Sequence, residues 1–130
     1  MNKIVVTGGA GFIGSHLAAA CSQLPNSPEV VVLDNLRTGR RANLERIQHP
    51  NLRWVEGSVT DPQKVDEVCR GADCIFHLAA MISVPESLLR PLECVDLNVN
   101  GTLHVLEAAR HHGVKKVVLS SSAAIYGDDP

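Results

Sequence analysis

Glycines near the start of the chain have the spacing of a phosphate-binding turn. Within Thr7–Gly14, the pattern GxGxxG begins at Gly9 and the overlapping pattern GxxGxxG begins at Gly8. Glycines permit a tight turn and let the backbone approach a pyrophosphate closely, and a helix that begins here offers free N–H groups to that anion. The segment therefore predicts a dinucleotide site. The alternative is a plain strand–helix turn that needs glycine only for steric reasons.

An acidic residue stands where such a site requires one. Asp34 follows Gly14 by about 20 residues, at the end of an apolar run expected to form the second strand. Its carboxylate can accept hydrogen bonds from the adenosine ribose hydroxyls and would repel a 2′-phosphate, which favours NAD over NADP. Arg37 and Arg40 follow closely and keep NADP open as an alternative.

Polar residues near the C-terminal end could also take part in chemistry. A serine triplet that includes Ser120 and Ser122 ends a predicted strand, and ligands of open α/β sheets bind at such carboxyl ends. From position alone, the alternative is that these serines cap a helix or lie in a loop. Asn98 falls within a predicted helix, where its side chain needs a polar partner unless it is exposed to solvent.

Strands and helices are expected to alternate, which positions these residues along one edge of a sheet. Helices should follow the glycine turn, ending before Pro25, and the Asp61-Pro62 pair, ending at Gly71. This order predicts an α/β fold in one domain, residues 1–130, with a Rossmann-type doubly wound parallel sheet of about five strands in the order 3-2-1-4-5. The expected strands are Lys3–Thr7, Val30–Leu33, Leu52–Val55, Cys74–Leu78 and Val117–Ser120. The stretch from Asn35 to Pro50 is expected to be a loop with one short helix.

A long helix is predicted between the last two strands, from about Leu92 to His111, and Gly113 should end it. His111 and His112 would lie in its last turn, where their donors suit the helix C-terminus better than a metal site. An apolar face is expected from residues at helical spacing: Val95, Val99, Leu103 or Thr102, Leu106 and Ala109.

The composition narrows the class of protein. Hydrophobic residues make up 45% of the 130 residues and aromatic residues only 3%, so the core must consist of Val, Leu, Ile and Ala. A net charge of −2 and the lack of a long apolar run predict no nucleic-acid partner, no membrane partner and a cytoplasmic protein. The four cysteines are widely spaced and form no CxxC, which favours reduced thiols and predicts no metal site.

Several segments in order resemble one family. After the glycine turn and Asp34-Asn35-Leu36 come His77-Leu78-Ala79-Ala80, then Asn98-Val99-Asn100-Gly101-Thr102, then the segment from Ser120 to Gly127. Along essentially its whole length the chain resembles the extended short-chain dehydrogenases/reductases of the NAD-dependent sugar-nucleotide epimerase/dehydratase group. Within that group it looks nearest to the UDP-sugar 4-epimerases, which are isomerases.

The resemblance implies a set of site residues. Phe12 and Ile13 would flank the pyrophosphate with the turn glycines Gly8, Gly11 and Gly14, Asp34 and Asn35 would hold the ribose, and Ser58 and Val59 would border the adenine. Leu78, Ala79 and Ala80 would form a wall beside NAD. Ser120 would also contact NAD. Asn98 would bond backbone and shape the site, and Ser122 would be the catalytic serine that bonds the sugar hydroxyl. The sequence departs from the family pattern at Ser58, where an acid is usual, and at Ile82, where some epimerases have lysine.

The family's general base, a tyrosine followed four residues later by lysine, is not present in these residues. The one tyrosine, Tyr126, is followed four residues later by Pro130. Tyr126 is therefore expected to be structural or to lie on the substrate side. We expect an N-terminal fragment of a longer epimerase, truncated before the catalytic Tyr/Lys helix and inactive alone.

The resemblance leaves the chemistry and assembly partly open. Ala123 and Ala124 stand where dehydratases and decarboxylases of the group tend to carry acids, so epimerase chemistry on a nucleotide sugar is favoured. Another NAD-dependent dehydratase or oxidoreductase of the family, or a non-catalytic dinucleotide-binding module, remains the alternative. An uncovered sheet edge and long helix would favour a homo-oligomer.

Overall fold

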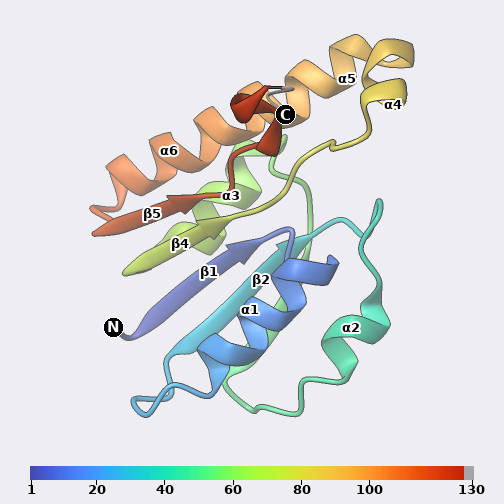
Figure 1. Ribbon diagram of the computed structural model, residues 1–130. Coiled ribbons are helices and arrows are strands. Elements are labelled where there is room, and N and C mark those ends of the chain that lie inside the picture. The colour runs from blue at the N-terminus through green and yellow to red at the C-terminus, as the bar shows by residue number, and fades with distance from the viewer. Residues whose placement is uncertain (128–130) are drawn as a thin grey trace.

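The computed structural model describes residues 1–127, which form a parallel five-stranded sheet with helices on both faces (Figure 1). Strand order is β3-β2-β1-β4-β5, and every pair of neighbours is parallel. The predicted fold class and strand order are both confirmed. The strands are β1 (Lys3–Thr7), β2 (Glu29–Asp34), β3 (Leu52–Glu56), β4 (Cys74–His77) and β5 (Lys116–Leu119).

Helices cover the two faces of the sheet separately. Helices α1 (Phe12–Ser22) and α2 (Arg41–Glu45) pack on one face, and α3 (Pro62–Cys69) and α6 (Gly101–His111) pack on the other (Figure 1). Between β4 and α6 the chain forms α4 (Val84–Leu89), α5 (Pro91–Val95) and a π-helical turn, Asp96–Asn100. A 3₁₀ turn, Ala123–Tyr126, follows β5. Within residues 1–127, none of the helices has the length and apolar character needed to span a bilayer.

The central strands are apolar because both of their faces are buried. Alternate residues of β1 point to opposite sides of the sheet, so Val6 packs in the core beneath α1 and Val5 in the core beneath α3 and α6. The same alternation places Val32 beside Val6 and Val31 beside Val5. This arrangement makes β1 the buried central strand of the sheet.

Local signals explain two helix starts. Asp61 caps α3 by accepting hydrogen bonds from the Gln63 and Lys64 N–H groups, both at 3.0 Å, as the Asp-Pro pair predicted. Helix α4 was not predicted, although Ser83 caps it by accepting from the Glu86 N–H at 3.3 Å. Ser83-x-x-Glu86 has the spacing of a capping box, and that signal could have revealed the helix.

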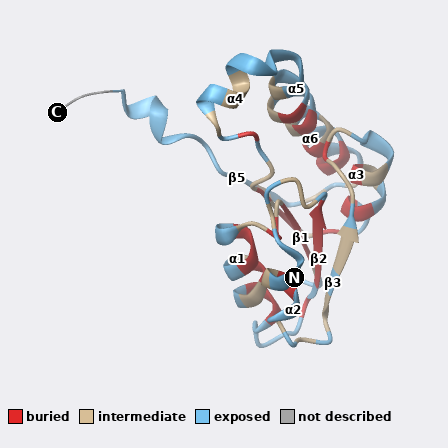
Figure 2. Ribbon diagram, turned by 90° about the vertical axis from the view of Figure 1, so that its right-hand side faces the viewer, coloured by how far each residue is buried: buried red, intermediate tan, exposed pale blue. Residues whose placement is uncertain are grey.

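The long helical segment departs from the expectation in orientation. Val95, Val99, Leu103 and Leu106 are 44–53% exposed, so the predicted apolar face points mostly to solvent. Ala109 of the predicted face is buried, and it packs against the sheet with Leu97, Val105 and Ala108 of a second apolar face. Figure 2 shows this division along α6, and also shows that the segment after β5 is exposed. The helix is apolar on two sides, and periodicity cannot tell which side meets the sheet.

His112 is the C-cap residue of α6, as expected, and its backbone N–H donates to the Ala108 carbonyl oxygen at 3.0 Å. Its side chain acts elsewhere: Nε2 lies 2.8 Å from the Asp66 Oδ1 atom, so the ring joins α6 to α3. His111 lies farther from the same oxygen, at 3.9 Å, and its ring stacks on that of His112. All four cysteines are free thiols, and burial raises the pKa of Cys69 to about 11, which keeps that thiol protonated.

Candidate functional site

A cleft of about 400 Å³ lies at the carboxyl ends of β1, β2 and β4. Ligands of doubly wound sheets bind in such a crevice, where neighbouring strands lead into helices on opposite faces. Of the predicted site residues, all but Asn98 and Ser122 line it: Gly8, Gly11, Phe12, Ile13, Gly14, Asp34, Asn35, Ser58, Val59, Leu78, Ala79, Ala80 and Ser120. Ile82, noted above as a departure from the family pattern, also lines the cleft, together with residues that the sequence did not point to: Leu33, Thr38, Gly39, Gly57 and Leu97.

Three glycines of the turn are required by the protein's own packing. A Cβ atom on Gly9 would lie 2.6 Å from Cγ1 of the buried Val32. Gly8 has φ +72°, and a Cβ atom there would lie 2.7 Å from the Ala79 backbone nitrogen. A Cβ atom on Gly14 would lie 2.2 Å from the Gly8 carbonyl oxygen. These glycines let the turn close against the end of β4 and against the start of α1.

Gly11 is different, because little in the protein requires a glycine there. Its φ is −72°, which any residue adopts, and a Cβ atom would meet only the Gly8 carbonyl oxygen, at 3.3 Å. Gly11 lines the cleft, so the missing side chain leaves room on the cleft side. This is the shape expected where a ligand approaches the backbone closely.

The N-terminus of α1 suits an anion. Among residues 1–127, no side chain caps this 11-residue helix, and its first turn contains no acidic residue. Phe12, Ile13 and Gly14 bring that turn to the cleft, where its N–H groups and the positive end of the helix dipole are available. Phe12 is 80% exposed, so a large apolar side chain stands at the cleft with little protein covering it.

Asp34 lies at the opposite side of the turn and is buried. Its Oδ2 atom accepts a hydrogen bond from the Ala10 N–H at 2.8 Å, and Oδ1 accepts one from the Leu36 N–H at 2.8 Å. The carboxylate thus fixes the glycine turn to the loop after β2. Each oxygen has a second lone pair, so the group can still accept hydrogen bonds from a ligand hydroxyl.

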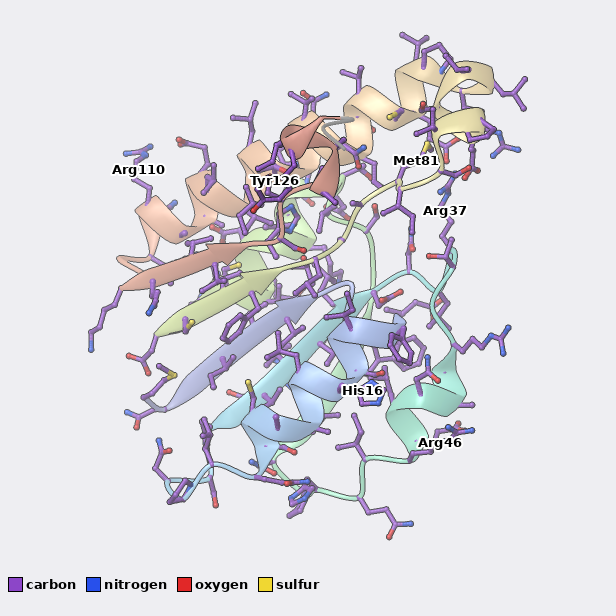
Figure 3. All side chains as sticks on the ribbon, in the orientation of Figure 1. His16, Arg37, Arg46, Met81, Arg110 and Tyr126 are labelled. Atoms are coloured by element: carbon purple, nitrogen blue, oxygen red, sulfur yellow. The ribbon has the colours of Figure 1, made fainter. Side chains whose placement is uncertain are left out.

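Of the two arginines near Asp34, only Arg37 lines the cleft. Its Nη2 atom lies 2.6 Å from Oε1 of Glu86 and 3.1 Å from Oε1 of Glu93. Figure 3 shows the Arg37 side chain reaching from the loop after β2 toward α4. Arg40 is exposed, and its backbone N–H donates to the Ala10 carbonyl oxygen.

A buried chain of hydrogen bonds supports the wall of the cleft. Thr102 donates its hydroxyl proton to the Asn98 carbonyl oxygen at 2.7 Å, so its oxygen accepts from Nε2–H of His77 at 3.0 Å. The other ring nitrogen, Nδ1, then accepts from the Thr7 hydroxyl at 2.7 Å, and Thr7 accepts from the Ala79 N–H at 3.3 Å. Burial lowers the pKa of His77, which keeps the ring neutral, as this pattern requires.

Asn98 stands behind the same wall and does not line the cleft. Its Oδ1 atom accepts from the Met81 N–H at 2.7 Å, and its Nδ2 donates to the Met81 carbonyl oxygen at 3.0 Å. The residue lies in the π-helical turn, a feature often found at functional sites. Asn98 therefore bonds backbone, as the resemblance implied, and is not an exposed helix residue.

Ser120 and Ser122, which follow β5, occupy different environments. Ser120 lines the cleft and is attached to β4 through its N–H, which donates to the His77 carbonyl oxygen at 3.1 Å. Ser122 is exposed, and its Oγ atom accepts from the Ala124 N–H at 3.1 Å. Tyr126 is 80% exposed (labelled in Figure 3) and Pro130 lies outside the described residues. Neither Ser122 nor Tyr126 lines the cleft.

The doubly wound sheet, the open glycine turn and the carboxylate at the end of β2 are the features of the class of dinucleotide-binding α/β folds. Comparison with known families agrees: the profile of the NAD dependent epimerase/dehydratase family matches residues 4–130. The chain belongs to this family.

Individual relatives point to sugar-nucleotide enzymes. The chain is 40% identical to a UDP-glucose 4-epimerase of Klebsiella pneumoniae over 98% of this chain and 94% of that protein. It is 42% identical to the UDP-glucose 4-epimerase of Lacticaseibacillus casei, of which it covers only 37%. A UDP-glucose-4-epimerase structure from Stenotrophomonas maltophila, with bound NAD and formylated UDP-arabinopyranose, has a TM-score of 0.88 at 33% identity. That match covers 99% of this chain and 39% of the other. The chain thus spans well under half the length of most of these relatives.

Proposed function

We propose that this chain binds NAD in the cleft at the carboxyl ends of β1, β2 and β4 and serves as the cofactor domain of a nucleotide-sugar epimerase. One observation carries the proposal. Gly11 leaves open space beside the uncapped N-terminus of α1, and Asp34 lies across the turn from it. In dinucleotide sites of this fold, the pyrophosphate lies at the glycine turn, and the ribose bonds an acidic residue about 20 residues farther along the chain.

The cleft offers a place for each part of the cofactor. The pyrophosphate is proposed to lie against Gly11, Phe12 and Ile13 at the start of α1. Asp34 and Asn35 then hold the adenosine ribose. The rest of the lining completes the site, with adenine beside Ser58 and Val59 and the nicotinamide half along Leu78, Ala79, Ala80 and Ser120.

NAD is proposed over NADP for a reason of charge. The Asp34 carboxylate would repel a 2′-phosphate, and it is held in place by two backbone hydrogen bonds. Arg37 is the arginine that lines the cleft, and its guanidinium already pairs with two glutamates. The alternative that Arg37 and Arg40 accept NADP is therefore disfavoured.

For the chemistry we propose epimerisation, for which NAD held by Gly11, Phe12, Ile13 and Asp34 would supply reversible hydride transfer at the sugar. Ala123 and Ala124 lack the acids expected of dehydratases and decarboxylases in the group. Ser122 is proposed to bond the reacting sugar hydroxyl, which requires it to move from its present cap on the Ala124 N–H or to donate outward from it. The resemblance supplies this role.

The 130 residues are proposed to act as the N-terminal domain of a longer enzyme. They contain no tyrosine followed four residues later by lysine, the pair that lets a phenolate take a proton near neutral pH. The chain covers only 37% and 38% of two UDP-glucose 4-epimerase relatives, which supports the same proposal. General acid–base catalysis contributes about 10²–10⁴-fold in rate, so the chain alone should bind cofactor without measurable turnover.

Calorimetry and an activity assay test both parts. Titration of the chain with NAD should show binding at one site per chain, with NADP at least ten times weaker, and Asp34→Ala should weaken NAD binding at least tenfold. Asp96→Ala, at an exposed acid away from the cleft, is the matched control. Absence of NAD binding would overturn the cofactor proposal. Conversion of UDP-glucose to UDP-galactose by the chain alone would contradict the dependence on residues outside it.

Self-association is proposed from the exposed apolar surface. Leu103 and Leu106 of α6 face solvent with Val95 and Val99, and Leu119 of β5 is 51% exposed. In the described residues β5 pairs with β4 alone, so one of its edges is open. We propose that a second copy covers this surface, because an exposed patch of this kind favours association. A cytoplasmic location is also proposed, since free thiols persist in a reducing compartment.

A further inference from the structure

The ion pairs of Arg37 suggest a second means of cofactor selection, besides Asp34. We propose that Glu86 and Glu93 are specificity-determining residues: they hold the Arg37 guanidinium and so prevent it from receiving the 2′-phosphate of NADP. The inference rests on the proposed function, because it concerns selection within the same dinucleotide site.

Arg37 is placed where it could read the adenosine ribose. It lies three residues after Asp34 and lines the same cleft. An arginine near this position is the residue that accommodates a 2′-phosphate in NADP-binding members of this fold, because its guanidinium fork matches phosphate oxygens. On position alone Arg37 would therefore favour NADP.

The two glutamates belong to a different segment of the chain from Arg37, which lies in the loop after β2. Glu86 lies in α4 and Glu93 in α5, both in the segment that follows β4. Each places its Oε1 atom on Arg37 Nη2, at 2.6 and 3.1 Å. The three side chains are only 23–43% exposed, and neither glutamate lines the cleft. Two carboxylates therefore engage one guanidinium nitrogen from outside the site.

The charge around Arg37 then disfavours a phosphate. Asp34, Glu86 and Glu93 supply three negative charges, against which stand Arg37 and Arg90, whose Nη1 lies 3.4 Å from Glu93 Oε2. A phosphate monoester carries about −1.5 to −2 charges near pH 7. To bind it, Arg37 must leave two ion pairs and approach a third carboxylate. NAD has a neutral 2′-hydroxyl in place of the phosphate, so it can bind while both ion pairs of Arg37 remain in place.

The double variant Glu86→Gln/Glu93→Gln tests the proposal by calorimetry with NAD and with NADP. Neutral amides release Arg37, so NADP affinity should rise about tenfold while NAD affinity stays within twofold of the starting protein. Adding Arg37→Ala to the double variant should abolish the gain. If the double variant does not fold, Glu93→Gln alone keeps the shorter Glu86 contact and should show a smaller gain of the same sign.

A matched control separates this effect from general charge. Glu45→Gln/Glu107→Gln removes the same charge and two exposed Arg–Glu pairs, with Arg41 and Arg110, and should leave both affinities unchanged. An unchanged ratio of NADP to NAD affinity in the Glu86/Glu93 variant would overturn the inference. So would an equal loss of both affinities, which a purely structural tether predicts. If the starting protein binds no NAD, the proposed function itself fails.

Discussion

Asp34→Asn is a small change in shape that should have a large effect. Each carboxylate oxygen of Asp34 accepts a backbone hydrogen bond at 2.8 Å, from Ala10 and from Leu36. An asparagine amide has one oxygen and one NH₂ group, so in either orientation a donor must face a backbone N–H. One charge-assisted hydrogen bond is lost at a buried position, which costs about 1.5–3 kcal/mol.

Urea unfolding measures this loss directly. For a slope of about 1–3 kcal/mol per molar urea, the unfolding midpoint should fall by roughly 1 M. Asp96→Asn is the control, because Asp96 is exposed and its carboxylate accepts a hydrogen bond from the Asn100 side-chain amide, at 3.0 Å. The control should stay within about 0.5 kcal/mol of the starting protein. An equally small effect of Asp34→Asn would refute the view that this carboxylate fastens the glycine turn.

The other predictions concern the turn, a buried histidine and the exposed helix face. Gly14→Ala places a Cβ atom 2.2 Å from a carbonyl oxygen and should lower the free energy of unfolding by at least about 2 kcal/mol, whereas Gly11→Ala should cost under about 1 kcal/mol and weaken NAD binding at least tenfold. Denaturation and calorimetry on the two variants check this contrast, and equal losses of stability would contradict it. Because the pKa of His77 is lowered from 6.5 in the folded state, the unfolded chain binds the proton more readily. The stability that neutral His77 contributes is therefore present above pH 6.5 and lost as the pH falls below it. Between pH 7.5 and 5.5, the free energy of unfolding of His77→Gln should depend less steeply on pH than that of the starting protein. An identical slope in the two proteins would exclude this role. Leu103→Asp/Leu106→Asp should reduce self-association in sedimentation without lowering stability, since these side chains are about half exposed; unchanged sedimentation would exclude this face as the contact.

The strands and the glycine turn were predictable because their signals are local. A run such as Val30–Leu33 is apolar at every position, which fits a strand buried on both faces. Asp61-Pro62 marks a helix start through a cap that acts within three residues. The strict alternation of such elements then fixed the sheet order, since few topologies satisfy it.

The orientation of the long helix could not be predicted in the same way. Leu103 and Leu106 have helical spacing, and so do Leu97 and Val105 on the neighbouring face. Only the packing of α6 on α3 and the sheet decides which pair is buried. Periodicity reports an apolar face but says nothing of what covers it.

Long-range polar contacts were equally hidden. Glu86 is 49 residues from Arg37 along the chain, and His77 meets Thr7 across 70 residues. Each pairing depends on how the sheet brings distant segments together, which no local pattern encodes. The resemblance correctly implied that Asn98 bonds backbone, yet its partner, Met81, became known only from the structure.

The most direct test of the central claim is a ¹⁵N–¹H NMR titration of the chain with NAD, because one experiment reports both binding and location. If NAD binds in the proposed cleft, the amide signals of Gly8–Gly14, Asp34, Asn35 and Leu78–Ala80 should shift. A second cleft of about 430 Å³, lined by His16 and Arg46 between α1 and α2 (Figure 3), should remain unperturbed. Shifts confined to that second cleft, or no shifts at all, would contradict NAD binding at the glycine turn.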